Sequence, residues 1–284
     1  MKSNLVYIVL AAILLLFGTG FGQSFFSPKR LWIDSYPDIG TCEKLDATTI
    51  KLSGPIDEAM YDCALPLLTL DIETVRVTTN GGDVAAGRAI GYKISDYPRH
   101  LIVDKVCLSS CGNYFVPAAA RITLLPRSVI GLHGTPDPQM LSNSDMENHM
   151  ESLIDEGDPT SEGLTRILKR KSERRARQLS EEAKFAAHLG VPKGWRLYRE
   201  EEDLDDGWRQ HFTPGSDEGL TPDNFMIVEG PMLASCLPHV KTENYQLTLE
   251  KTVFKNQSLW SGLEETMGAY RSFGLTCSPP PAQQ

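Results

Sequence analysis

Short runs rich in β-branched residues alternate with helix-compatible segments through the first half of the chain. Strands that alternate with helices imply right-handed crossovers and a mostly parallel sheet with helices on both faces. The expected strands are 47–53, 73–79, 101–107, 122–125 and 128–132, and the expected helices are 58–70, 84–95 and 113–120. The fold class is therefore predicted to be α/β with a mostly parallel sheet.

The character of the chain changes after residue 138. Residues 140–189 are charged, with apolar residues at helical intervals that predict one or two long helices, and residues 245–254 are expected to form a closing strand. The predicted organisation is a linker at 23–46, a core at 47–138, an inserted helical and acidic region at 139–215, a C-terminal completion of the core at 216–276 and a disordered tail at 277–284.

Residues 1–22 are expected to direct export. Lys2 precedes an apolar run at 5–17, and Gly20 and Gly22 supply the small residues that a signal peptidase requires. The rival interpretation is a retained membrane anchor, because residues 5–22 are about as long as a minimal span. In either case the remaining chain leaves the cytoplasm, where its six cysteines are expected to form disulfides. Six cysteines allow fifteen pairings, and the sequence does not choose among them.

The formal net charge is −9, which argues against nucleic acid as a general partner, because binding phosphates needs a basic face. A basic cluster at 169–177 is expected to be a solvated helix face. Its alternative role is contact with anionic lipid, should the N-terminal segment stay in the membrane.

Residues 107–112 (CLSSCG) stand between a strand-like run and a helix-compatible run. Such a turn exposes a serine oxygen and leaves backbone N–H groups free beside it. Serine needs a base and donors for the developing negative charge, so Ser109 is the candidate nucleophile and His133 the candidate base. The Gly81-Gly82 turn supplies further N–H groups. One helix and one return strand between Ser109 and His133 bring both residues to one sheet edge.

Three motifs in this order carry a family resemblance: NGGDVAAGRAI at 80–90, CLSSC at 107–111 and VIGLH at 129–133. They resemble the proteolytic subunit of the Clp protease and its exported relatives in the ClpP/crotonase superfamily. The resemblance covers about residues 47–138. It implies a spiral of βαβ units and, through the stacking of family members, self-association into rings as a homo-oligomer.

The same resemblance implies roles for individual residues. Ser109 falls at the nucleophile and His133 at the base, and the N–H groups of Gly82 and Ser110 fall at the oxyanion hole. The family places its aspartate just before a Leu-Ser/Thr pair that opens a helix, which selects Asp217, with Asp206 and Asp223 as alternatives. That aspartate would hold the imidazole tautomer and stabilise the imidazolium.

Two neighbours of Ser109 are alternative nucleophiles. Ser110 is one, because adjacent serines leave the alignment uncertain by one position. Cys111 is the other, if it stays reduced with a low pKa. Cys107 and Cys111 are also expected to form a disulfide, with each other or with other cysteines.

The predicted function is an extracytoplasmic serine peptidase that works without ATP, through a covalent acyl-enzyme, on short peptides or unfolded chains. One alternative is a binding or scaffold protein that keeps the fold without turnover. Another is crotonase-like chemistry on an acyl thioester. No cofactor is expected, and the histidines and cysteines lack zinc-site spacing.

Overall fold

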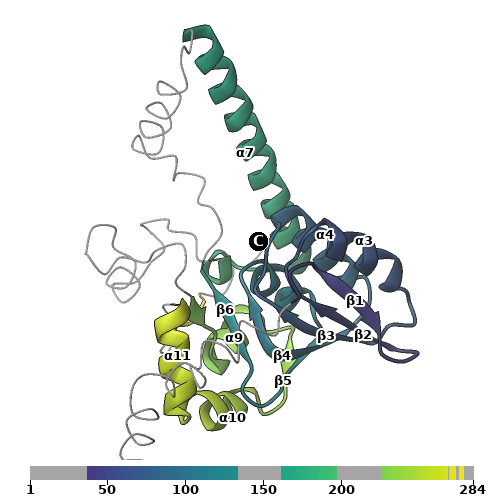
Figure 1. Ribbon diagram of the computed structural model, residues 1–284, viewed down its shortest axis with the longest axis vertical. Helices are drawn as coiled ribbons and strands as arrows, with labels where there is room; N and C mark the ends of the chain where they lie inside the picture. Colours follow the sequence, from purple (N-terminus) through teal and green to yellow (C-terminus); the bar gives the residue numbers. More distant parts are fainter. Residues whose placement is uncertain (1–36, 134–160, 197–224, 268, 273–274, 278–284) are drawn as a thin grey trace, which may run out of the picture.

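The computed structural model describes residues 37–133, 161–196, 225–267, 269–272 and 275–277. Within these ranges the chain forms a nine-stranded sheet in the order β1-β2-β3-β4-β6-β7-β9, and β5 pairs with β4 and β8 (Figure 1). The strands are β1 Thr41–Lys44, β2 Thr49–Ser53, β3 Thr74–Thr79, β4 His100–Leu108, β5 Arg121–Leu124, β6 Val129–Leu132, β7 Met226–Ile227, β8 Lys241–Thr242 and β9 Tyr270–Arg271.

The sheet is mostly parallel, so the α/β class predicted from the alternation of strands and helices is confirmed. Only the β1–β2 and β6–β7 pairings are antiparallel among the described strands. The long helical stretches between β2, β3 and β4 serve as the crossovers that parallel pairing requires. β1 lies inside the range 23–46 that was predicted as a linker, so the sheet begins before residue 47.

A bulge in β4 separates the residues that pair with β5 from the residues that pair with β6. The register with β3 shifts between Val77 and Thr79, and Lys105 has a φ of +76°. Before the bulge β4 pairs with β5, and after it β4 pairs with β6. The Lys105 N–H donates to Ser128 Oγ at 2.7 Å, which satisfies a backbone donor that the bulge takes out of the ladder. The bulge therefore brings the end of β4 beside the end of β6.

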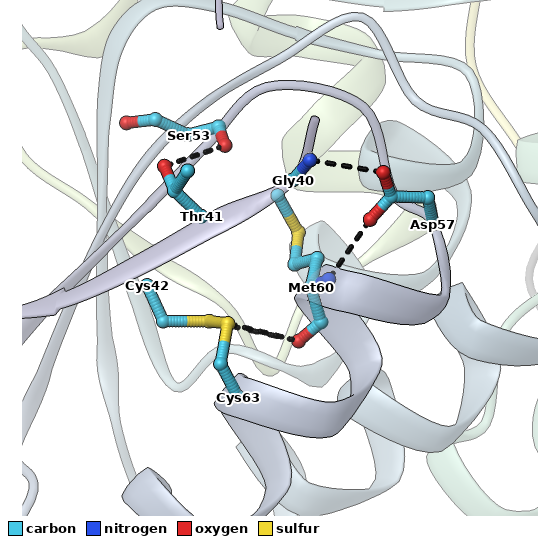
Figure 2. Close-up of a disulfide and its surroundings, with 7 residues drawn as sticks. All are labelled: Gly40, Thr41, Cys42, Ser53, Asp57, Met60 and Cys63. Carbon is cyan, nitrogen blue, oxygen red and sulfur yellow. Dashed lines mark hydrogen bonds between the residues drawn. A yellow bond between two sulfur atoms is a disulfide. The ribbon is translucent and has the colours of Figure 1, made fainter. Parts of the chain in front are cut away.

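The first crossover helix, α3 (Glu58–Leu67), begins at an aspartate cap. Asp57 Oδ1 accepts from the Met60 N–H at 2.8 Å and Oδ2 accepts from the Gly40 N–H at 2.9 Å, as Figure 2 shows. Burial opposes ionisation of this carboxyl, but the two N–H donors outweigh it and lower the pKa of Asp57. A disulfide between Cys42 and Cys63 ties β1 to the same helix.

Arg99 is a buried cation, 1% exposed, that binds the ends of two helices. Its guanidinium donates to carbonyls of Leu68 and Thr69 after α3 and to carbonyls of Lys93 and Ile94 in α4 (Val84–Ser95). Carbonyls at a helix C-terminus lack intrahelical donors and carry partial negative charge. One side chain therefore caps both helices immediately before β4 begins.

The long helix α7 (Ser161–Leu189) runs outward from the sheet and its helices (Figure 1). Its C-terminal part packs on the body, where Phe185 makes edge contacts with Tyr92 and Tyr114 at 5.0 and 5.4 Å between ring centroids. This single helix covers part of the region for which one or two long helices were predicted. Residues 134–160 and 197–224 lie outside the described residues.

The predicted strand at 245–254 is wrong. These residues form α10 (Tyr245–Leu249) and the π-helix η3 (Glu250–Phe254), which follow α9 (Gly230–Cys236) and precede α11 (Gln257–Met267). Tyr245, Leu249 and Val253 are buried while Leu247 is half exposed, so the buried spacing is four and not two. The alternating pattern at 245, 247 and 249 mimics a strand by chance.

A third disulfide joins Cys236 at the end of α9 to Cys277. Residue 277 was placed in the tail and is instead bonded to the body, whereas 278–284 lie outside the described residues. The predicted export segment or anchor at 1–22 lies outside them too. Among the helices that are described, none combines the length and the apolar character needed to cross a membrane.

Candidate active site

Three loops meet at one edge of the sheet. Gly81 and Gly82 follow β3, Ser109 follows β4, and His133 follows β6. These strands are mutually parallel, so their carboxyl ends lie at the same edge, where open α/β sheets place their ligands. The bulge in β4 completes the arrangement by pairing Leu108 with Gly131.

Ser109 occupies a sharp turn between β4 and the π-helix η1 (Cys111–Phe115), which continues into α5 (Val116–Ala118). Its φ of +53° lies in the left-handed region that residues with a side chain rarely adopt. The Ser109 N–H donates to Gly131 O at 3.0 Å, and Ser109 O accepts from the Asn113 N–H at 2.8 Å. These bonds hold the backbone in a conformation that leaves the side chain partly exposed.

The Ser109 hydroxyl is in hydrogen-bond contact with an imidazole. Its Oγ lies 2.6 Å from Nε2 of His133, which is exposed at the end of β6. With the imidazole proton on Nδ1, the hydroxyl donates to Nε2. That is the arrangement in which a histidine can take the proton of an attacking serine. The structure thus brings together the two residues that the sequence selected as nucleophile and base.

The glycine turn lies against Ser109 and Ser110. A Cβ on Gly81 would lie 2.6 Å from the Cβ of Ser109, and a Cβ on Gly82 would lie 2.3 Å from Ile56 O. Both glycines also have φ values, +91° and +145°, that side chains disfavour. Within the described residues, the N–H groups of Gly82 and Ser110 have no hydrogen-bond acceptor. Two donors are therefore available beside the hydroxyl for a developing oxyanion.

The alternative nucleophiles are both engaged elsewhere. Ser110 is 2% exposed, and its hydroxyl donates to Gly82 O at 2.7 Å. Cys111 forms a disulfide with Cys107, and both residues are fully buried. A thiol nucleophile at position 111 is therefore excluded in this state, and of the two serines only Ser109 contacts His133.

A buried polar cluster connects the helix that follows the Ser109 turn to two other helices. Glu182 of α7 accepts from Arg88 of α4 and, at 2.7 Å, from the hydroxyl of Tyr114 in η1. Burial, followed by the nearby Glu182 carboxylate, raises the pKa of Tyr114, so its hydroxyl stays a donor. The helix that begins just after Ser109 is thereby joined to α4 and to α7.

The aspartates considered for the triad, Asp217, Asp206 and Asp223, lie outside the described residues. No group of histidines, cysteines and carboxylates in the described part of the chain is suited to hold a metal ion. The sequence did not point to Phe225, whose ring lies beside that of His133. Phe225 is brought there by the pairing of β7 with β6. Because β7 is only two residues long, no pattern in a single sequence predicts that pairing.

No protein-family model matches the chain, and no curated protein matches it. Among solved structures, it is similar to ClpP1 of Listeria monocytogenes, with 19% identity and a TM-score of 0.29 over 48% of this chain and 72% of that one.

It is also similar to two enoyl-CoA hydratases. That of Rhodopseudomonas palustris has 10% identity and a TM-score of 0.26, with coverage of 33% of this chain and 48% of that one. That of Shewanella pealeana has 8% identity and a TM-score of 0.25, with coverage of 37% and 52%. The chain thus spans about half the length of these hydratases.

Proposed function

We propose that this protein is an extracytoplasmic serine hydrolase, a peptidase that works without ATP through a covalent acyl-enzyme. The single observation that carries the proposal is the 2.6 Å contact between Ser109 Oγ and His133 Nε2 at the carboxyl edge of the sheet. The N–H groups of Gly82 and Ser110, which have no acceptor among the described residues, add the donors that acyl transfer requires.

In the proposed reaction, Ser109 Oγ attacks the carbonyl carbon of the scissile bond while His133 Nε2 takes the hydroxyl proton. The carbonyl oxygen becomes an oxyanion that accepts from the N–H groups of Gly82 and Ser110. His133 then gives its proton to the leaving amine, and the C–N bond breaks to leave an acyl-serine. Water, deprotonated by His133, hydrolyses this ester and restores Ser109.

An oxidising compartment is supported by the three disulfides, Cys42–Cys63, Cys107–Cys111 and Cys236–Cys277. We expect no ATP-driven unfoldase to feed this site outside the cytoplasm. The proposed substrates are therefore short peptides, exposed termini and unfolded chains. Self-association and attachment through residues 5–22 stay predictions, which sedimentation and detergent partitioning of the full chain would test.

A fluorophosphonate probe tests the proposal directly, because it reacts with an activated serine. The oxidised wild-type protein is expected to be labelled on Ser109, as mapped by peptide mass spectrometry. Ser109→Ala and His133→Ala are each expected to lower the labelling rate by about 10⁴-fold or more. Ser258→Ala, a change at an exposed serine of α11, is the matched control and should react at the wild-type rate.

The proposal fails if the folded, oxidised wild type is not labelled, or if labelling persists in Ser109→Ala. Labelling mapped to Ser110 would reassign the nucleophile. Incubation with a peptide library then distinguishes a peptidase from an esterase. A peptidase should give cleaved peptides with the wild type and none with Ser109→Ala.

A further inference from the structure

His133 is an exposed ring at the end of a short strand, and a base must be held in one orientation to work. An imidazole turns about two side-chain torsions, and a turn about either would carry Nε2 away from Ser109. Catalytic geometry is sensitive to shifts of about 1 Å. The residues that restrict the ring therefore matter to the site as much as the ring itself.

Phe225 contacts the His133 ring. The two ring centroids lie 5.0 Å apart with an interplanar angle of 85°, an edge-to-face arrangement. This geometry is favourable for aromatic pairs because the positive edge of one ring meets the negative face of the other. A ring held in this way resists rotation, because turning it loses the contact.

The pairing of β6 with β7 explains why Phe225 lies there. The antiparallel register joins Gly131 to Ile227 and Leu132 to Met226, so the next pair in the series is His133 and Phe225. Directly opposed residues of an antiparallel pair have neighbouring side chains. The contact is thus determined by the register of β6 with β7 and not by the conformation of a loop.

Gly131 lies between the end of β4 and this ring. A Cβ on Gly131 would lie 2.7 Å from Leu108 Cδ2, too close for a side chain, and in ordinary van der Waals contact with Phe225, 3.4 Å from its Cβ and 3.5 Å from its Cδ1. The carbonyl of Gly131 also accepts from the Ser109 N–H. One residue of β6 therefore lies between the nucleophile and the aromatic ring that touches the base.

We propose that Phe225 is a positioning residue that holds the His133 imidazole toward Ser109. The inference rests on the proposed function, since it assigns a role in the same site. Phe225 acts through His133 and does not contact the reacting bond. The short strand β7 thereby contributes to the site although it lies far along the chain from Ser109.

The test replaces the ring while keeping the fold. Phe225→Leu keeps apolar volume without an aromatic face, and Phe225→Tyr keeps the face. In a peptide-turnover assay with the full chain, Phe225→Leu is expected to lower kcat by about tenfold with little change in KM. Phe225→Tyr is expected to restore most of the wild-type kcat. Phe254→Leu removes a similar edge contact, 5.1 Å and 79° against Trp260, and should leave kcat unchanged.

NMR of the His133 ring protons gives a readout that does not need activity. Phe225→Leu should remove the ring-current shift of these protons, and Phe254→Leu should not. If the shift disappears and kcat stays at the wild-type value, the positioning role is overturned. An unchanged shift overturns the contact itself. If the fluorophosphonate probe does not label Ser109 in the wild type, the proposed function fails. The NMR shift is measured independently of that result, so the two failures can be told apart.

Discussion

Cys107 and Cys111 are joined by a disulfide across the turn that carries Ser109, four positions apart in sequence. Cys107 belongs to β4, whose register with β3 and β6 is fixed on both sides, and Cys111 is the first residue of η1. The bond thus connects the strand to the helix around a residue in a disfavoured backbone conformation.

Removing this bond should lower reactivity more than stability. We expect Cys107→Ala with Cys111→Ala to slow fluorophosphonate labelling of Ser109 by about tenfold or more, because the turn gains alternative conformations. Near-ultraviolet circular dichroism checks that the double variant is folded. The matched double variant, Cys42→Ala with Cys63→Ala, opens a disulfide of β1 and α3. It should lower the free energy of unfolding by about 3 kcal/mol and leave the labelling rate unchanged. Equal labelling rates in both double variants would contradict a role for the Cys107–Cys111 disulfide in the reactivity of Ser109.

A side chain at position 82 should remove an oxyanion donor. Gly82→Ala places a Cβ against the Ile56 carbonyl and strains a φ of +145°, so the turn must move. We expect kcat to fall by about 10²- to 10³-fold, the usual loss for one donor. Gly190→Ala is the control, since Gly190 also has a positive φ, +66°, but a Cβ there would meet open space. That variant should lose about 1 kcal/mol of stability and keep its kcat.

The triad aspartate is open to a direct comparison. Asp217 is selected by the resemblance, with Asp206 and Asp223 as the alternatives. We expect Asp217→Asn to lower kcat by about 10⁴-fold, because the imidazole loses the partner that holds its tautomer. Asp206→Asn and Asp223→Asn are the matched comparisons and should stay near the wild type. A loss confined to either of these two variants would reassign the third member of the triad.

Asp57 should make stability depend on acid pH. Its pKa is lowered in the folded protein by the Gly40 and Met60 N–H groups, which outweigh burial. A carboxyl with a lowered pKa stabilises the fold above its unfolded pKa, near 3.9, and this contribution is lost as pH falls through the folded value. Asp57→Ala should therefore cost about 1 to 2 kcal/mol at pH 7. In urea unfolding, the difference from wild type should shrink below pH 4. A difference that stays constant to pH 2 would rule out this linkage.

The sequence was most informative where local chemistry and tertiary structure agree. The helix predicted at 84–95 is α4 with the same bounds, because Asp83 caps it and its apolar positions face the core. The strands around the site were also predicted within a residue or two. Since parallel strands end at a common edge, the approach of Ser109 to His133 could be inferred from spacing alone.

Features that depend on register could not be predicted. The bulge at Lys105 is defined by the register of β4 with β3, and the position of Phe225 follows from the pairing of a two-residue strand. At 245–254 the sequence predicts a strand, whereas the structure has α10 and η3, in which Tyr245 and Leu249 are buried and Leu247 is half exposed. Which of those apolar residues is buried is decided by packing against the rest of the protein, and no local pattern contains that information.

Arg99 and Ser109 flank the two ends of the nine-residue strand β4, and the ten residue steps between them correspond to roughly 33 Å of extended chain. Arg99, which caps α3 and α4, is thus remote from the Ser109 hydroxyl. The free-energy effects of substitutions at two sites so far apart are expected to be additive. Substitutions at Arg99 should therefore lower the unfolding midpoint, while each molecule that stays folded keeps the contact between Ser109 and His133 unchanged.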